Sequence, residues 1–407
     1  MSLRFLTLDD VEVESKRVLV RVDINSPMKP GTEEIMDDSR FVAILDTLKD
    51  LEKSKVAILA HQGRPGESDF TSMRSHFRVL QKYVGSRAKF VEDIIGPAAI
   101  DSIQKLKKGD VLLLDNARLL SEEVMEGTPE LFARTQLVRR LSPLFDLFVN
   151  DAYPAAHRAQ ASMVGFPEVL TALAGRSMER ELKALNKALY EPDRPSIFVL
   201  GGAKVPDKLK ILANILEKKK VDRVLLSGLM GIVFLEASGI NLGEGSRGNL
   251  KDFESLKKQA KDLLARYREN IMLPRDVAVS IDHKRVEIPV DKIPKDAAVK
   301  DIGEATIKEY TDQILKAKTI LANGPPGVFE DKDFAKGTQQ VLKAMAQSKG
   351  FSVIGGGHLA VLAKEEMIEK SIGYVSTGGG ATMAMLAGQK LPGVEALYKA
   401  AKRITTK

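Results

Sequence analysis

Residues 18–25 read VLVRVDIN, a short run of apolar, mostly β-branched residues that ends in Asp23, Ile24 and Asn25. Such a run predicts a buried strand, and the polar residues behind it mark the end of that strand. Short runs of the same kind recur along the whole chain, separated by longer amphipathic segments. Because strands that alternate with helices build stacked βαβ units, the pattern indicates an α/β protein with parallel sheets.

The same pattern places the individual elements. We expect strands in the first half at 18–23, 56–60, 111–114 and 147–150, and in the second half at 197–200, 223–227, 277–281, 320–322, 351–354 and 373–375. Helices are expected at 40–51, 75–84, 129–141, 207–219, 250–267 and 334–347. These elements predict two parallel sheets, each covered by helices.

The length of the chain and a break in its pattern indicate two domains. A chain of 407 residues is longer than one hydrophobic core usually supports. The helical segment 178–189 ends in YEPDRP (190–195), a turn-rich break before the next strand. We therefore expect two doubly wound parallel-sheet (Rossmann-like) domains joined by a hinge helix. The first is 1–176; the second is 177–391 and begins with the interdomain helix 178–189.

Composition excludes several classes of protein. No apolar run approaches the roughly 20 residues of a membrane-spanning helix, and the N-terminal sequence has acidic residues where a secretion signal is apolar. We therefore expect a soluble, cytoplasmic protein with no membrane partner. The absence of cysteine excludes disulfides, thiolate metal sites and a cysteine nucleophile.

The charge balance bears on nucleic-acid binding. The net charge of +7 permits it, but aromatic residues make up only 5% of the chain and lysines such as those of EKKK (217–220) alternate with acids at helical spacing. A solvated helix surface is the better interpretation, so we expect no nucleic-acid partner. We expect a monomer or a small homo-oligomer.

Charged and polar residues follow the predicted strands of the first half. Ligands of open parallel sheets bind beyond the carboxyl ends of the strands, where these residues lie. They are Asp23 and Asn25, His61-Gln62-Gly63-Arg64, Asp115-Asn116-Ala117-Arg118, Asp151 with His157-Arg158, and Arg40 behind the first loop. The arginine side chain offers a planar fork of donors that matches phosphate and carboxylate, so the set suits a small, multiply charged anion.

Each of these residues also has a purely structural interpretation. Asp23 and Asn25 are common turn formers, Arg64 can be a surface charge, and His61 can be a satisfied core histidine. Recurrence at four successive strand ends favours a site.

The strand ends of the second half are rich in glycine instead. The segments are Gly201-Gly202-Ala203-Lys204 with Lys208, Ser227-Gly228, Asn323-Gly324-Pro325-Pro326-Gly327, Gly355-Gly356-Gly357-His358 and Ser376-Thr377-Gly378-Gly379-Gly380. Glycine lets a phosphate approach the backbone, and a helix N-terminus behind it presents free N–H groups, so these segments predict a nucleotide site. Neither GxxxxGK[ST] nor a clear GxGxxG is present, which disfavours the usual P-loop and dinucleotide folds. Lys204 and Lys208 either reach a transferring phosphate or form an ordinary first-turn helix surface.

Nine ordered segments resemble the phosphoglycerate kinase family over nearly the whole chain. They are RVDINSP (21–27), DSR (38–40), HQGRP (61–65), DNARL (115–119), FVNDAYPAAHRAQAS (148–162), LGGAKVPDK (200–208), NGPPGVFE (323–330), GGGH (355–358) and STGGGA (376–381) with LPGVEAL (391–397). The resemblance implies reversible phosphoryl transfer between 1,3-bisphosphoglycerate with ADP and 3-phosphoglycerate with ATP, in glycolysis or gluconeogenesis. It also implies Mg²⁺ bound with ATP or ADP, in-line transfer on domain closure, and a C-terminal segment (392–407) that returns to the first domain.

The resemblance also implies roles for single residues. The residues implied to bind 3-phosphoglycerate are Asp23, Asn25, Arg40, His61, Gln62, Gly63, Arg64, Arg118 and Arg158, with His157 beside them. Those implied to face the nucleotide are Lys204, Lys208, Glu330, Gly355, Gly356, Gly357 and His358. Arg40, Lys204 and the helix amides near Gly379 are implied to stabilise the transferring group.

The sequence departs from the family pattern at three positions. Many members have Asp where this chain has His358, so we name no metal ligand. Ala322 stands where many members have Trp, and Leu119 stands where they have an aromatic residue. In its His358 and its compact loops, the sequence resembles archaeal members of the family.

Two other functions fit part of the sequence. Another small-molecule kinase that uses acyl or carbamoyl phosphates would share the basic site and the glycine-rich loops. A nucleotide-regulated nucleic-acid-binding protein is suggested only by the net positive charge.

Overall fold

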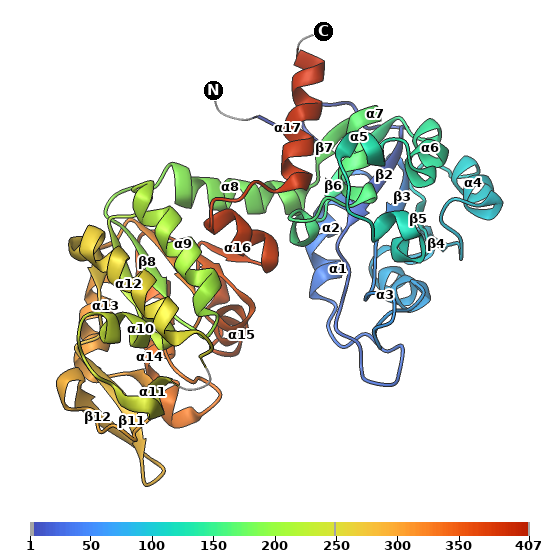
Figure 1. Cartoon of the computed structure of the whole chain (residues 1–407). Helices are drawn as coiled ribbons and strands as arrows, with labels where there is room; N and C mark the ends of the chain where they lie inside the picture. The colour runs from blue at the N-terminus through green and yellow to red at the C-terminus, as the bar shows by residue number, and fades with distance from the viewer. Residues whose placement is uncertain (1–3, 248–249, 406–407) are drawn as a thin grey trace. The chain divides into compact units, whose positions relative to one another are not determined.

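The computed structural model describes residues 4–247 and 250–405, which divide into two compact units (Figure 1). The first unit runs to Leu182 and resumes at Lys390, and the second unit is Lys183–Gln389. The predicted first domain included residues 1–3 and 406–407, which lie outside the described residues. No helix within the described ranges is long and apolar enough to span a membrane.

The first unit is built on a seven-stranded sheet in which all neighbouring strands are parallel. Its strand order is β1 (Leu6–Thr7), β7 (Thr171–Ala174), β6 (Leu147–Asp151), β2 (Arg17–Val22), β3 (Lys55–Leu59), β5 (Val111–Leu113) and β4 (Ala88–Phe90). The chain leaves β2 towards β3 on one side and later returns to place β6 on the other. This change of direction between β2 and β6 is a topological switch point, where α/β proteins bind ligands.

Helices cover both faces of this sheet. They are α1 (Ser39–Ala43), α2 (Leu45–Asp50), α3 (Arg74–Val84), α4 (Pro97–Gln104), α5 (Pro129–Phe132), α6 (Gln136–Leu141), α7 (Phe166–Val169) and α17 (Pro392–Thr405). Alternate residues of β2 pack against α1, α2 and α3 in one hydrophobic core, and this core also includes Ala401 of α17. Consecutive strand residues point to opposite faces of the sheet, and helices cover both faces. Nearly every residue of β2 is therefore buried.

Two helices expected to be continuous are broken, so those predictions were wrong in detail. Within 40–51, the Ile44 amide bonds back to the Phe41 carbonyl, a tightened turn that separates α1 from α2. Within 129–141, the Glu122 carboxylate accepts the amides of Gln136 and Leu137 at 2.8 and 2.9 Å and thereby gives α6 its own N-terminus. The spacing of apolar residues does not change at such a break, because the same face stays buried on both sides of it. The spacing therefore does not reveal the break.

The second unit has a six-stranded parallel sheet. Its order is β10 (Ile271–Met272), β9 (Arg223–Leu226), β8 (Ser196–Leu200), β14 (Thr319–Asn323), β15 (Phe351–Gly355) and β16 (Tyr374–Ser376). The helices are α9 (Val205–Glu217), α10 (Gly228–Ala237), α11 (Gly243–Arg247), α12 (Phe253–Tyr267), α13 (Glu304–Lys316), α14 (Lys336–Gln347), α15 (Gly357–Glu365) and α16 (Gly380–Leu386). α13, α14 and α15 share one core with the sheet. The predicted fold class of two parallel-sheet α/β layers is confirmed.

One strand was assigned to the wrong sheet. Residues 277–281 were expected in the parallel sheet, but β11 (Asp276–Ile281) is the centre of a separate antiparallel sheet with β12 (Lys284–Pro289) and β13 (Val299–Ile302). Only Asp282 and His283 join β11 to β12, and both have positive φ angles of 48° and 60°. A two-residue connection of this kind closes a hairpin and is far too short for a parallel crossover.

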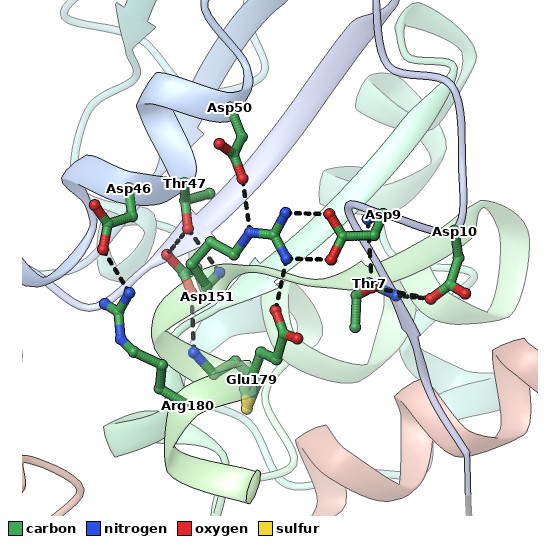
Figure 2. Close-up of polar contacts among 11 residues, drawn as sticks. Thr7, Asp9, Asp10, Asp46, Thr47, Asp50, Asp151, Glu179 and Arg180 are labelled. Atoms are coloured by element: carbon green, nitrogen blue, oxygen red, sulfur yellow. Dashed lines mark hydrogen bonds and ion pairs between the residues drawn. The ribbon is translucent and has the colours of Figure 1, made fainter. Parts of the chain in front are cut away.

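Helix α8 (Arg176–Tyr190) begins in the first unit and continues into the second. Figure 2 shows how its first turn is held to the first unit. The Arg176 guanidinium forms ion pairs with Asp9, Asp50 and Glu179, and Arg180 pairs with Asp46. The start of α8 is therefore fixed by charges from two other segments of the same unit.

A buried carboxyl group lies beneath this charge cluster. Asp151, the last residue of β6, accepts the Met178 amide at 3.0 Å and the Thr47 hydroxyl at 2.6 Å (Figure 2). The Thr47 hydroxyl in turn accepts the Arg176 amide at 2.8 Å. Burial raises the pKa of Asp151 to about 7, although the hydrogen bonds oppose the shift.

Candidate active site

The predicted basic residues of the first unit gather at the carboxyl edge of its sheet. Asp23 follows β2, His61 follows β3, Arg118 lies in a short 3₁₀ turn behind β5, and Arg158 lies behind β6. These four strands are neighbours in the order β6-β2-β3-β5, so the edge surrounds the switch point. Asp151 also ends a strand here, but its side chain is bound to the first turn of α8.

Asp23 and Arg40 form an ion pair at this edge. Arg40 is the second residue of α1, and its Nη1 donates to Asp23 Oδ1. Burial alone would raise the pKa of Asp23, but Arg40 and the other nearby cations outweigh it, so the pKa lies below its ordinary value. About a third of the Arg40 side chain remains exposed at 32%, so the guanidinium is still accessible to a ligand.

A hydrogen-bond network fixes the loops behind β2, β3 and β5 relative to one another. Gly63 donates its amide to Asn25 Oδ1 at 2.9 Å, and its carbonyl accepts from Arg118 Nη1. Gln62 Oε1 accepts the Ser26 amide at 3.0 Å, and Asn116 Nδ2 donates to the Gln62 carbonyl at 2.8 Å. Asn25, Gln62, Gly63 and Arg118 therefore support one another.

The cations at this edge repel one another. Burial lowers the pKa of Arg118 to about 10, with Arg158 and Arg21 adding to the shift. Burial also lowers the pKa of Arg158, and Arg64 contributes as a neighbouring charge. Arg158 Nε lies 3.3 Å from His157 Nε2, whose pKa is lowered by burial and by Arg158. Asp23, Glu67 and Glu123 offset part of this repulsion, and an anion bound here would relieve more of it.

Sequence reasoning missed the buried groups beneath the edge. Arg21, in β2, is wholly buried and donates through Nε to Ser162 Oγ at 2.7 Å and through Nη2 to His61 Nδ1 at 3.0 Å. Its Nη2 also lies 3.8 Å from Oε1 of Glu123, another wholly buried side chain. The signal was present, because Arg21 is a charge in the middle of an otherwise apolar run.

The glycine-rich loops of the second unit also lie along one edge. They follow β8, β14, β15 and β16, which are consecutive strands of the sheet. The Pro325 carbonyl accepts the Gly202 amide at 2.8 Å, the Asn323 carbonyl accepts the Gly201 amide at 3.0 Å, and the Asn323 side chain donates to the Gly355 carbonyl. The order reverses between β8 and β14, which makes this the switch point of the second sheet.

The structure separates glycines that the fold requires from glycines that it does not. A Cβ at Gly201 would lie 2.5 Å from the Pro325 carbonyl oxygen and 2.6 Å from Ser227 Oγ. A Cβ at Gly357, at the start of α15, would meet nothing within 4 Å. Gly379 likewise has open space, although its φ of +49° disfavours other residues. Open space before a helix N-terminus is what the approach of a phosphate needs.

The two lysines behind β8 differ in environment. Lys204 is exposed at the N-terminus of α9, whereas Lys208 is buried and its Nζ donates to the Gly201 carbonyl. Burial lowers the pKa of Lys208 to about 8, and the charge of Lys204 adds to the shift. Lys208 is therefore not an ordinary helix-surface residue, while Lys204 has its ammonium free to reach a ligand.

The last two predicted nucleotide residues, Glu330 and His358, both lie next to Phe329, one in sequence and one in space. Glu330 is exposed in the segment behind β14, next to Phe329. The His358 ring, at the start of α15, packs on the Phe329 ring with centroids 5.4 Å apart. Among the described residues, no three or more His, Asp or Glu side chains form a group able to hold a metal ion. Neither His358 nor Glu330 is thus part of such a group.

A cationic edge on one parallel sheet and a glycine-rich edge on another define a class of protein, the kinases that phosphorylate a small anionic acceptor. Residues 8–389 match the family model for phosphoglycerate kinase. The chain belongs to the phosphoglycerate kinase family. Membership makes it a phosphotransferase, as the resemblance implied.

Individual relatives agree over almost their full length. The chain is 48% identical over 404 residues to a phosphoglycerate kinase of Methanothermus fervidus, covering 98% of each chain. It is 46% identical to that of Methanothermobacter thermautotrophicus, covering 98% of this chain and 97% of the relative. The crystal structure of phosphoglycerate kinase from Pyrococcus horikoshii is 40% identical, with a TM-score of 0.87 and 98% and 99% of the two chains covered. The predicted likeness to archaeal members is confirmed.

Proposed function

We propose that the cationic edge of the first unit binds 3-phosphoglycerate and that the glycine-rich edge of the second unit binds ATP or ADP. The chain then transfers a phosphoryl group reversibly between 1,3-bisphosphoglycerate with ADP and 3-phosphoglycerate with ATP, the glycolytic reaction of its family. The observation that carries this proposal is the gathering of Arg64, Arg118 and Arg158 at one sheet edge. Burial and mutual repulsion lower the pKa of Arg118 and of Arg158 there, even though Asp23, Glu67 and Glu123 offset part of the repulsion.

The acceptor has distinct groups that match distinct residues. Arg64, Arg118 and Arg158 offer guanidinium groups to the phosphate, because planar forks of N–H donors fit its oxygens. Asp23 and Asn25 suit the hydroxyl group. Gln62 and Gly63 hold the loops of this edge in place. Gly63 has a φ of +62°, and a Cβ at this position would lie 2.6 Å from the backbone of Asp69 and Phe70.

Transfer itself needs charge neutralisation more than acid–base chemistry. The attacking carboxylate is ionised at neutral pH, so no general base is required. Arg40 and Lys204 are partly or fully exposed cations on the two units, and we assign both to the transferring phosphoryl group, with the backbone amides at Gly379. Lys208, Gly355, Gly356, Gly357, Glu330 and His358 line the nucleotide side.

Magnesium enters this proposal with the nucleotide, as Mg·ATP or Mg·ADP. Bound to the phosphate oxygens, it neutralises part of their charge. We name no residue of this chain as its ligand.

The two ligand edges belong to different units, so transfer requires the acceptor oxygen and the γ-phosphorus to meet in one closed complex that excludes water. We place the hinge at α8, because it is the helix that passes from one unit to the other. Small-angle scattering that showed no compaction with both ligands bound would count against closure. We further propose that the enzyme works in the cytoplasm as a monomer or small homo-oligomer.

The test is ATP-dependent formation of an acyl phosphate, trapped by hydroxylamine, with 3-phosphoglycerate as acceptor and with magnesium present or omitted. Acetate and carbamate serve as competing acceptors, since a different acyl or carbamoyl phosphate kinase would prefer one of them. We expect product with 3-phosphoglycerate and magnesium only. Preference for another acceptor would overturn the proposed substrate.

A further inference from the structure

Arg21 is a buried cation that touches His61 but does not reach the ligand edge itself. The Arg21 side chain is 0% exposed, and each of its donor groups has a partner inside the protein: Ser162 Oγ, the Val22 carbonyl and His61 Nδ1. Glu123 balances its charge, and Glu123 is held in turn by the Ser162 amide at 2.9 Å and by the Ser162 hydroxyl. A guanidinium fixed on this many sides cannot turn away from His61.

The contact with His61 decides where the proton of the imidazole lies. A guanidinium has only donors, so the Nδ1 atom 3.0 Å from Arg21 Nη2 has to act as the acceptor and carries no proton. A neutral imidazole in that state carries its proton on Nε2. We propose that Arg21, held by Glu123 and Ser162, is a positioning residue that fixes the buried His61 side chain, 3% exposed, as a neutral imidazole. Its Nε2–H, on the part of the ring away from Arg21, is then the donor to 3-phosphoglycerate. This inference rests on the proposed function only for the identity of the acceptor.

The charges around His61 support the neutral form. Burial, followed by the charge of Arg21, holds the pKa of His61 well below its ordinary value. Arg118 and Arg158 act in the same direction, and the Asp23 carboxylate opposes them.

A neutral donor has a specific advantage at this edge. The edge already carries Arg64, Arg118 and Arg158, whose mutual repulsion costs stability before the ligand binds. His61 adds a hydrogen bond without adding a further positive charge. Substrate affinity then stays independent of His61 titration across the range in which an ordinary histidine changes charge.

The first test observes the tautomer directly in the ligand-free protein. The chain has five histidines, so selective ¹⁵N-histidine labelling gives a tractable spectrum, and a His61→Gln variant identifies the His61 signals. We expect a pyridine-type Nδ1 and a pyrrole-type Nε2 that do not titrate between about pH 5 and pH 8. A pyridine-type Nε2, or conversion to imidazolium near pH 6.5, would overturn the proposal. Neither outcome depends on catalytic activity, so the result is separable from failure of the proposed function.

The second test removes Arg21. The double variant Arg21→Met/Glu123→Gln removes both buried charges together, so that no single charge stays buried without its opposite partner. We expect the KM for 3-phosphoglycerate to rise about tenfold, the value for one lost hydrogen bond to a charged ligand, and to become pH-dependent, while kcat changes less than about twofold. An unchanged KM with unchanged His61 nitrogen signals would refute the role of Arg21.

Two further variants keep this test specific. Arg17→Met removes a cation from the same strand, where Arg17 Nη1 only caps the Leu144 carbonyl at 3.3 Å, and we expect wild-type KM and His61 signals. Arg21→Lys restores a donor-only cation beneath His61. It should recover the Nε2–H tautomer and part of the affinity, whereas a role of Arg21 in packing alone predicts no recovery of the tautomer.

Discussion

Replacing Asp151 with Asn should change how the stability of the first unit depends on pH. The pKa of Asp151 rises from an ordinary value of 3.8 to about 7 in the folded protein because the carboxyl group is buried beneath α8. Below about pH 4 the group is protonated in both folded and unfolded states. Between about pH 4 and pH 7 only the folded state keeps the proton, so the folded state loses stability as the pH rises. Above pH 7 the loss is complete.

The size of the effect follows from the shift. About three pKa units at 1.36 kcal/mol each amount to roughly 4 kcal/mol. An asparagine has no charge to bury, and its amide can still accept the Met178 amide and donate to Thr47. We therefore expect the stability of Asp151→Asn relative to wild type to improve by up to about 4 kcal/mol between pH 4 and pH 8.

Urea unfolding followed by circular dichroism at several pH values measures this difference. Asp101→Asn is the matched control, because Asp101 is 59% exposed in an i,i+4 pair with Lys105 and should give no such trend. If the difference between Asp151→Asn and wild type stays constant within about 1 kcal/mol, the reasoning fails. The hydrogen bonds from Thr47 and Met178 would then outweigh burial, and Asp151 would be ionised throughout.

Three further variants test other parts of the structure. Arg40→Ala should lower kcat about 10³-fold, and a change in the KM for 3-phosphoglycerate alone would exclude a role for Arg40 in the transition state. Gly201→Ala should destabilise the second unit by about 1–3 kcal/mol, because the new Cβ meets the Pro325 carbonyl. Gly357→Ala should alter stability by less than about 0.5 kcal/mol and weaken nucleotide binding instead. Equal melting temperatures for the two variants would contradict this distinction. Leu397→Ala, in the wholly buried face of α17, should cost the first unit about 3 kcal/mol in urea unfolding, and a loss below about 1 kcal/mol would mean that α17 is not part of its core.

The strands that carry the fold were predictable because each is a short, buried, β-branched run. β2, β3, β8 and β14 lie within one or two residues of their predicted positions. The failures have local causes. The hairpin at Asp282 and His283 has no glycine to mark it, and the short edge strands β1, β4 and β10 are too brief to show a period.

The candidate site was predictable where chemistry follows a strand end. Asp23, His61 and Arg118 do so, and their strands prove to be neighbours. What the sequence did not reveal is the network beneath them, because Glu123 lies in a 3₁₀ turn and Ser162 in a π-helical turn, both far along the chain from Arg21. Only the fold brings these three side chains together. The one local sign is the arginine inside the apolar run of β2, because a buried guanidinium needs partners.

The first unit is assembled from both ends of the chain, since α17 packs on β7 and α7 after the roughly 200 residues of the second unit have intervened. Figure 1 shows α17 in red beside β7. At about 5–20 residues per second, a ribosome takes on the order of 10–40 s to synthesise that intervening stretch. During this interval the second unit is contiguous and can fold, while the surface that Leu397 and Ala401 will cover stays exposed to water. The first unit is thus begun first but completed last, because its final helix is synthesised after the whole second unit. Nascent-chain chaperones therefore have the longest time to bind the first unit.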